Sequence, residues 1–210
     1  MKQRSWTIPV VAFGLLAALA GAVLVSRPAL VRADPGVLYV KATGATSGNC
    51  GSWSNACQLQ YALSLAGTSD EIWVTAGTYK PTGGTDRSAT FQLKSGVAIY
   101  GGFAGTEASL DQRNPDPATN STVLSGDIGT SGNDGDNAYH VVTGSGTDAS
   151  AVLDGFTITG GKAEGDHYTG GGMFNNGGSP TLRNLIFSDN QATHHGGGVY
   201  NENGSHPRLT

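Results

Sequence analysis

Two aspartates have a spacing that would suit carbohydrate chemistry. Asp127 follows Leu-Ser-Gly, and Asp154 lies in Leu-Asp-Gly at a shift of 27. Glycoside hydrolysis needs two carboxylates at a set separation, one acting as acid and the other as base or nucleophile. Both contexts are also typical of turns, in which an aspartate hydrogen-bonds its own backbone. We expect the turn role, with stacking on one face and catalysis as the alternative.

Other polar clusters could bind a metal ion. Residues 133–137 read Asn-Asp-Gly-Asp-Asn and are rich in the oxygen ligands that calcium prefers, but they lack the bidentate glutamate of an EF-hand loop. His194 and His195 are adjacent, and neighbouring residues of a strand point to opposite faces, which makes a poor joint site. We expect solvated turns at both places. His140 alternates with Val141 in an expected strand and is interpreted as a half-buried structural histidine, with a catalytic role as the alternative.

The two cysteines, Cys50 and Cys57, lie close together in the sequence. A disulfide is the expected state in an oxidising compartment. A two-cysteine metal site is the alternative, but no nearby histidine or further cysteine would complete it. We therefore predict no metal site and no cofactor, and the sequence assigns no catalytic residue.

The first 33 residues have the pattern of a secretory signal peptide. Lys2 and Arg4 precede an uncharged run at residues 6–25, and small residues precede a cleavage point after Ala33. A retained membrane anchor is the alternative, because the apolar run is long. Either way we expect the remainder to lie outside the cytoplasm, with no membrane insertion once the signal is cleaved.

Charge narrows the choice of partners. The chain carries 12 basic and 16 acidic residues, and four of the basic ones but none of the acidic ones lie in the leader, which leaves the remainder at −8. An acidic surface repels phosphate backbones and anionic lipid, so nucleic acid is not expected as a partner.

The elements that would position these residues repeat. The segment GGGMFN at residues 170–175 returns as GGGVYN at residues 196–201, a shift of 26. Leu182 returns as Leu209 at a shift of 27, and residues 153–163 match residues 182–192 at a shift of 29. Self-similarity at such periods predicts a solenoid. Apolar residues alternate in Phe156-x-Ile158 and Leu185-x-Phe187, as in strands rather than helices.

These features predict an all-β protein, a right-handed parallel β-helix, with short strands at 37–40, 72–74, 91–93, 97–100, 122–124 and 139–142. Asn190, and Asn175 with Asn201, would hydrogen-bond between coils. Leu59, Ala62, Leu63 and Ala66 have helical spacing before Gly67, which predicts a short α-helix that caps the apolar end of the solenoid. The expected organisation is a leader at 1–33, a strand and capping helix at 34–69, and coils at 70–210 that are truncated at the C-terminus.

The segments at 170–175, 179–182 and 184–192 resemble the repeats of bacterial right-handed parallel β-helix surface proteins, whose repeats are similar to those of chlamydial polymorphic outer-membrane proteins. Segments such as 71–79 and 100–107 are similar to the region that often precedes those repeats. The resemblance implies export and a β-helix. It favours a surface or secreted adhesin or binding scaffold with an extracellular polysaccharide or a surface protein as partner. A polysaccharide lyase or glycoside hydrolase on the same fold is the alternative, and an inert fragment of a longer protein is a third.

Overall fold

The computed structural model describes residues 36–210, so the expected signal peptide lies outside the described residues. Within this range the chain forms fourteen strands, one α-helix and four 3₁₀ turns. The 3₁₀ turns are η1 (Trp53–Asn55), η2 (Leu110–Gln112), η3 (Asp134–Asp136) and η4 (Gly165–His167). No helix of the described part is both long enough and apolar enough to cross a bilayer.

The strands form three sheets. The largest has the order β1 (Val37–Ala45), β2 (Glu71–Thr75), β5 (Ala98–Phe103), β8 (Val152–Thr159), β11 (Thr181–Ser188) and β14 (Arg208–Leu209), with β3 (Gly77–Tyr79) and β6 (Thr122–Ser125) beside it. The second has the order β13 (Val199–Glu202), β10 (Met173–Asn176), β7 (Val142–Thr143) and β4 (Phe91–Gln92). The third pairs β12 (Gln191–Ala192) with β9 (Lys162–Ala163).

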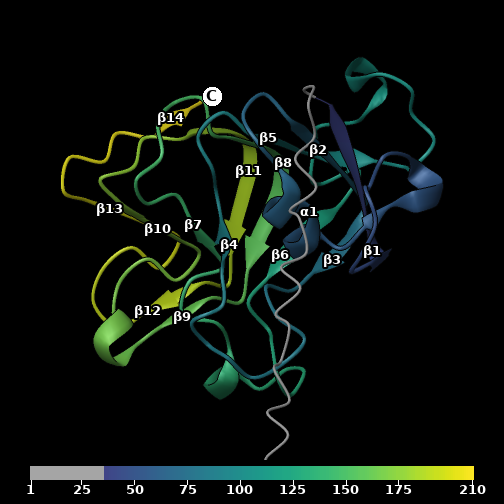
Figure 1. The fold of residues 1–210 in the computed structure, drawn as a ribbon. Coiled ribbons are helices and arrows are strands. Elements are labelled where there is room, and N and C mark those ends of the chain that lie inside the picture. Colours follow the sequence, from purple (N-terminus) through teal and green to yellow (C-terminus); the bar gives the residue numbers. More distant parts are fainter. Residues whose placement is uncertain (1–35) are drawn as a thin grey trace, which may run out of the picture. The chain divides into compact units, whose positions relative to one another are not determined.

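Every pairing between these strands is parallel. Parallel partners need a long connection, because the chain must return to the edge from which it started. In Figure 1, β8 and β11 lie side by side and the loops that follow them take similar paths to β9 and β12. The chain is therefore β-rich, with parallel sheets as the sequence predicts.

The strand registers follow the sequence repeat. Leu182 pairs with Leu153 at a shift of 29, Met173 pairs with Val199 at a shift of 26, and Leu182 pairs with Leu209 at a shift of 27. Because the period of side-chain direction in a strand is two, a slip of one residue would turn each apolar side chain out of the core. The repeat thus fixes which residues face inward.

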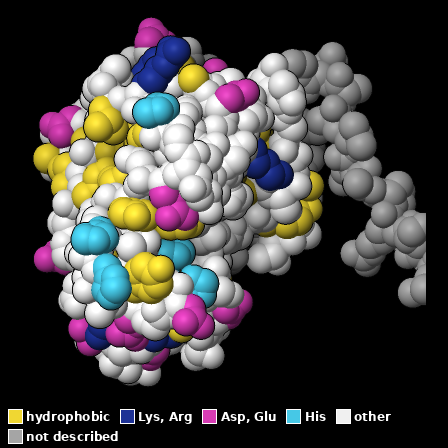
Figure 2. All heavy atoms as spheres, turned by 90° about the vertical axis from the view of Figure 1, so that its left-hand side faces the viewer, with side chains coloured by type: hydrophobic (Ala, Val, Ile, Leu, Met, Phe, Trp, Pro, Cys, Tyr) yellow, Lys and Arg dark blue, Asp and Glu magenta, His cyan; other side chains and the backbone are white. Residues whose placement is uncertain are grey.

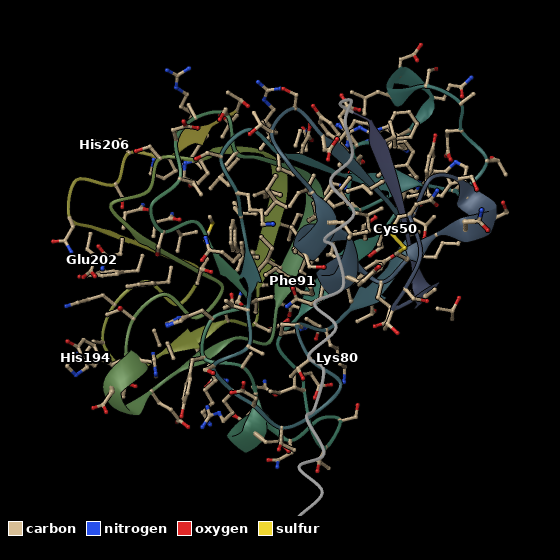
Figure 3. The ribbon with its side chains drawn as sticks, in the orientation of Figure 1. Cys50, Lys80, Phe91, His194, Glu202 and His206 are labelled. Atoms are coloured by element: carbon tan, nitrogen blue, oxygen red, sulfur yellow. A yellow bond between two sulfur atoms is a disulfide. The ribbon has the colours of Figure 1, made fainter. Side chains whose placement is uncertain are left out.

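One inward row crosses the large sheet from β1 to β11. Leu38, Ile72, Ile99, Leu153 and Leu182 are paired in register and are at most 2% exposed. The strands of the second sheet add Phe91, Val142 and Met173 to the same apolar core. Figure 3 shows Phe91 in the middle of the strands. The two sheets therefore share one core.

The neighbouring row points the other way. It reads Tyr39, Trp73, Tyr100, Asp154 and Arg183 across β1, β2, β5, β8 and β11. Phe103 stacks on Trp73 at 4.7 Å between ring centroids, and Trp53 lies edge-on to Tyr39 at 4.7 Å. This aromatic cover buries Trp73 to 4% exposure although it lies on the outer side of the strand.

The predicted helix and disulfide are both present. Helix α1 (Leu59–Leu65) buries Leu59, Ala62 and Leu63 against β1 and β2. The bond between Cys50 and Cys57 joins Cα atoms 5.3 Å apart, and both residues are fully buried. Figure 3 shows it as the yellow bond at Cys50. The alternative of a two-cysteine metal site is therefore wrong.

The strand expected at 139–142 is shorter in the structure, because β7 begins at Val142. The Tyr139 amide donates to the Arg87 carbonyl, which belongs to a loop and not to a neighbouring strand. His140 therefore precedes the strand and does not alternate within it.

The glycine triplets are structural. Gly170 and Gly196 have φ values of +73° and +64°, which favour glycine, and a Cβ on Gly171 would collide with the Gln191 carbonyl oxygen of the next coil. They allow neighbouring segments of backbone to approach closely, and this explains their recurrence at the period of the strands.

We expect Leu153→Ala to lower the free energy of unfolding by about 2–5 kcal/mol, because it opens a cavity in the inward row. Urea unfolding monitored by circular dichroism measures this. Ile186→Ala, on β11 but 39% exposed, is the matched control and should cost far less. Equal costs for the two variants would contradict the assignment of inward and outward rows.

Candidate functional site

The structure does not bring Asp127 and Asp154 together. Asp154 pairs in register with Tyr100 and Arg183. The strand before Asp127 pairs with β8 through Val123 and Thr157, so its register differs from the spacing of the two aspartates. Asp127 accordingly lies beside Gly160. The alternative, in which the two carboxylates stack on one face, is therefore wrong.

The Asp154 carboxylate is held in a buried network. Arg113 Nη2 donates to Asp154 Oδ2 at 2.7 Å, and Asn184 Nδ2 donates to Asp154 Oδ1 at 2.8 Å. The side chains of Arg113 and Asp154 are only 8% and 6% exposed. Arg113 also lies over the Tyr100 ring at 5.0 Å from its centroid. Both carboxylate oxygens are occupied, so Asp154 joins the loop that carries η2 to the sheet and does not face a substrate.

Asp127 forms the turn contacts that its context predicts. Its Oδ1 accepts from the Gly132 amide at 3.0 Å, and its Oδ2 accepts from the Ser131 hydroxyl at 3.2 Å. Lys80 Nζ lies 3.8 Å from the same carboxylate. These contacts close the loop between β6 and η3.

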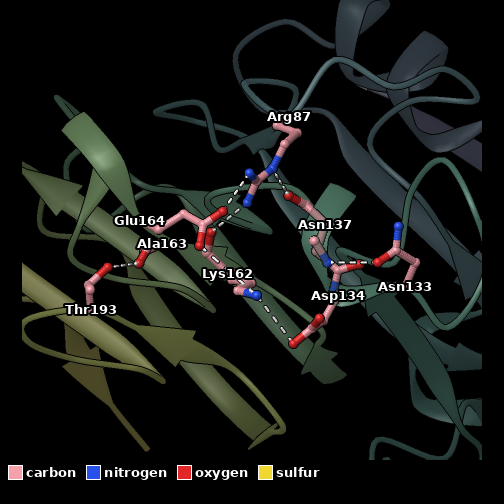
Figure 4. A network of polar contacts seen from close by, with 9 residues as sticks. Arg87, Asn133, Asp134, Asn137, Lys162, Ala163, Glu164 and Thr193 are labelled. Carbon is pink, nitrogen blue, oxygen red and sulfur yellow. Dashed lines mark hydrogen bonds and ion pairs between the residues drawn. The ribbon is translucent and has the colours of Figure 1, made fainter.

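The oxygen-rich loop at 133–137 is largely tied to its surroundings (Figure 4). Asn133 Oδ1 accepts from the Gly135 amide at 3.1 Å, and Asp134 Oδ2 lies 3.3 Å from Lys162 Nζ. Arg87 donates to the Asn137 carbonyl and forms an ion pair with Glu164 at 2.7 Å. These contacts hold the loop as a turn against the neighbouring segments of the chain.

Two side-chain oxygens of this loop are exceptions. Asp136 Oδ1 and Asn137 Oδ1 are buried and have no hydrogen-bond partner in the structure. Within residues 36–210, no cluster of three or more histidine, cysteine or acidic side chains has the arrangement of a metal site.

The histidines come together at a place that the sequence did not predict. His194 and His195 are exposed, as expected for a turn. Their rings, with His140 and His167, belong to a group of aromatic contacts that extends over β10 and β13. Figure 2 shows histidine side chains gathered around apolar side chains on this face, with acidic side chains close by. In Figure 3, His194 and Glu202 project from the same side of the molecule.

Four of these rings form a column, which we call the ring column. His140 stacks on Phe174 at 5.0 Å, Phe174 stacks on Tyr200 at 6.2 Å, and Tyr200 stacks on His195 at 6.3 Å between centroids. Successive planes differ by 19°, 10° and 14°. The parallel register explains the central pair, because Phe174 and Tyr200 are direct partners in β10 and β13.

A second set of rings lies alongside the column. Tyr139 stacks on His167 at 4.5 Å, and the Arg87 guanidinium lies 4.3 Å from the Tyr139 ring centroid. Tyr168 contacts His194 at 4.7 Å and remains 46% exposed. Tyr168 is one of the few large apolar side chains of the described part that water reaches freely.

Between the two sets lies a hollow of about 170 Å³, which we call the aromatic hollow. Its lining combines aromatic rings, histidines and carboxylates: His140, Asp166, His167, Tyr168, Thr169, Phe174, Tyr200 and Glu202. Its lining includes no lysine and no arginine. Concave surfaces lined by rings with a few convergent polar groups are typical of ligand sites.

Burial favours the neutral form of the His140 ring. Its pKa lies below the ordinary value of 6.5, chiefly because burial disfavours the charged ring. The Gly170 carbonyl, 3.0 Å from Nδ1, works in the opposite direction, and His167 nearby lowers the pKa further. A carbonyl oxygen only accepts, so Nδ1 carries the proton of the neutral ring and donates it to Gly170.

Comparison of the chain with models of known protein families, with curated proteins and with solved structures finds no match. The function must therefore be inferred from the hollow itself. A signal for it was present in the sequence: Tyr168 and His194 are related by the same shift as Phe174 and Tyr200. Aromatic residues repeated at the period of the strands predict stacked rings.

We expect Asp154→Ala to lower the free energy of unfolding by about 3–5 kcal/mol, because it leaves the Arg113 charge buried and unpaired. Asp127→Ala should cost about 1 kcal/mol or less, since its ion pair is partly exposed. Urea unfolding measures both. Similar small costs for the two variants would contradict a structural role for Asp154.

We expect His140 to make the protein less stable in mild acid. As pH falls below 6.5 the unfolded chain binds the proton first, so the free energy of unfolding falls until pH passes the lower pKa of the folded state. Urea unfolding at a series of pH values should show this decline reduced in His140→Gln. His206→Gln, an exposed histidine that does not line the hollow, should keep it. Identical pH profiles for all three proteins would contradict this assignment.

Proposed function

We propose that the chain is an exported right-handed parallel β-helix that acts as a surface or secreted binding scaffold for an extracellular polysaccharide. Three observations support the architecture. All strand pairs are parallel, the registers repeat at the shifts of the sequence repeat, and the two larger sheets share one core. In this proposal, α1 covers the apolar end next to β1, and the disulfide holds the segment that leads into it.

Export rests on the pattern of the first 33 residues, and the disulfide is compatible with it, since such bonds persist in oxidising compartments. The repeats that resemble those of polymorphic outer-membrane proteins point the same way.

The aromatic hollow is the observation that carries the binding role. Sugar rings present a face of C–H groups that packs on aromatic side chains, and their hydroxyl groups hydrogen-bond carboxylates and histidines. Tyr168, Phe174 and Tyr200 supply the rings, and Asp166 and Glu202 supply the acceptors. Because Phe174 and Tyr200 are partners in β10 and β13, a polymer lying across these strands would meet the edge of one ring after the other.

A polymer-cleaving enzyme on the same fold is the second candidate. The pair Asp127 and Asp154 does not support it, because the two lie apart and Asp154 is fully engaged. Asp166 and Glu202, which line the same hollow, are the carboxylates at which such an activity would be sought.

We expect the mature protein to bind at least one glycan of a panel of neutral, amino and acidic oligosaccharides, and Tyr168→Ala to weaken that binding about tenfold or more by removing the most exposed ring. Calorimetric titration measures the affinity. His206→Ala, an exposed ring outside the hollow, is the matched control and should bind like the unmodified protein. Binding to no member of the panel would contradict the proposal. Release of new reducing ends from a bound glycan would favour the enzyme.

A further inference from the structure

The carboxylates of the aromatic hollow differ from the other acidic side chains. Fifteen acidic residues lie in the described part, and twelve of them have a hydrogen bond or an ion pair through the carboxylate. The remaining three are Asp166, Asp189 and Glu202. Asp166 and Glu202 both line the aromatic hollow, whereas exposed carboxylates elsewhere in the described part form hydrogen bonds or ion pairs.

The hollow also lacks a permanently charged cation, since the basic side chains that line it are the histidines His140 and His167. No lysine or arginine lines it. Two basic side chains of adjoining segments are already engaged: Arg87 with Glu164 and the Tyr139 ring, and Lys162 with Asp134 and Glu164. Two carboxylates within a ring-lined concavity therefore keep their charge unpaired, which repels anionic ligands and attracts cations.

The rings favour the same kind of ligand. Tyr168, whose ring is 46% exposed, carries an electron-rich face that attracts an ammonium group within about 6 Å of the ring centroid. A carboxylate beside such a ring adds a charge-assisted hydrogen bond to the N–H groups. A bare metal ion fits the hollow poorly, because aromatic carbons are not ligands for it and the described residues form no metal cluster there.

We propose that the aromatic hollow binds a glycan of amino sugars whose amines are free, through contact of each ammonium group with the Asp166 and Glu202 carboxylates and the surrounding rings. This inference rests on the proposed function and specifies its ligand. The glycan is favoured over a basic peptide because Phe174 and Tyr200, partners in neighbouring strands, both line the hollow and offer two adjacent apolar rings to a sugar ring.

The test compares two hexamers of equal length, one of glucosamine and one of N-acetylglucosamine, at slightly acidic pH where the free amines carry protons. We expect the glucosamine hexamer to bind about tenfold tighter or more, with a preference that falls as salt is added. Asp166→Asn combined with Glu202→Gln should abolish the preference while leaving the shape of the hollow. Asp189→Asn removes the third unpaired carboxylate, which does not line the hollow, and should leave the preference unchanged.

The other outcomes separate the two proposals. Equal affinity for the two hexamers, or tighter binding of a galacturonate oligomer, would overturn the ammonium inference and leave a glycan-binding scaffold. A lysine hexapeptide that binds as tightly as the glucosamine hexamer, and loses affinity in the double variant, would overturn the choice of a glycan. If no oligosaccharide binds although the variants unfold cooperatively, the proposed function fails together with the inference.

Discussion

The in-register pairing of parallel strands is the constraint on which the rest of the structure depends. Leu153 must stack between Ile99 and Leu182, and this single register places the inward apolar row, the outward polar row and every loop between them. A slip by one residue would place Asp154 where Leu153 lies and would bury a charge in the core. Loop length varies between coils because a turn can absorb an extra residue without changing this alignment.

The same stacking produces the candidate site. Residues at equal positions in successive coils lie one strand spacing apart, so like side chains meet: Asn175 donates to Asn201 at 2.7 Å, and Phe174 faces Tyr200. Asn190 bonds to backbone groups instead of a like side chain. Its Oδ1 accepts from the Gly161 amide, and its Nδ2 donates to the Ile158 carbonyl. The stacked pair of Phe174 and Tyr200 thus follows from repetition, whereas the unpaired carboxylates beside it do not recur at the repeat period.

The sequence predicted the parts of the fold that repeat or that depend on neighbours in the chain. The shifts of the sequence repeat became strand registers, and the helix and the disulfide involve residues close in sequence. It did not predict contacts made by loops of irregular length. Arg113 reaches Asp154 from a distant loop, and the pairing of Val123 with Thr157 separates Asp127 from Asp154. His140 was expected within a strand, but hydrogen bonds to loop carbonyls place it before one, where it can stack on Phe174.

The order of the large sheet has a mechanical consequence. β1 and β14 lie at its two ends, and each intervening strand is hydrogen-bonded to the next. A force that draws residues 36 and 210 apart would load these strand interfaces in series. The strands would then separate one after another. Each rupture would release a segment of one repeat, while the coils behind it keep their structure. Such a molecule would lengthen stepwise under tension and dissipate work at each step.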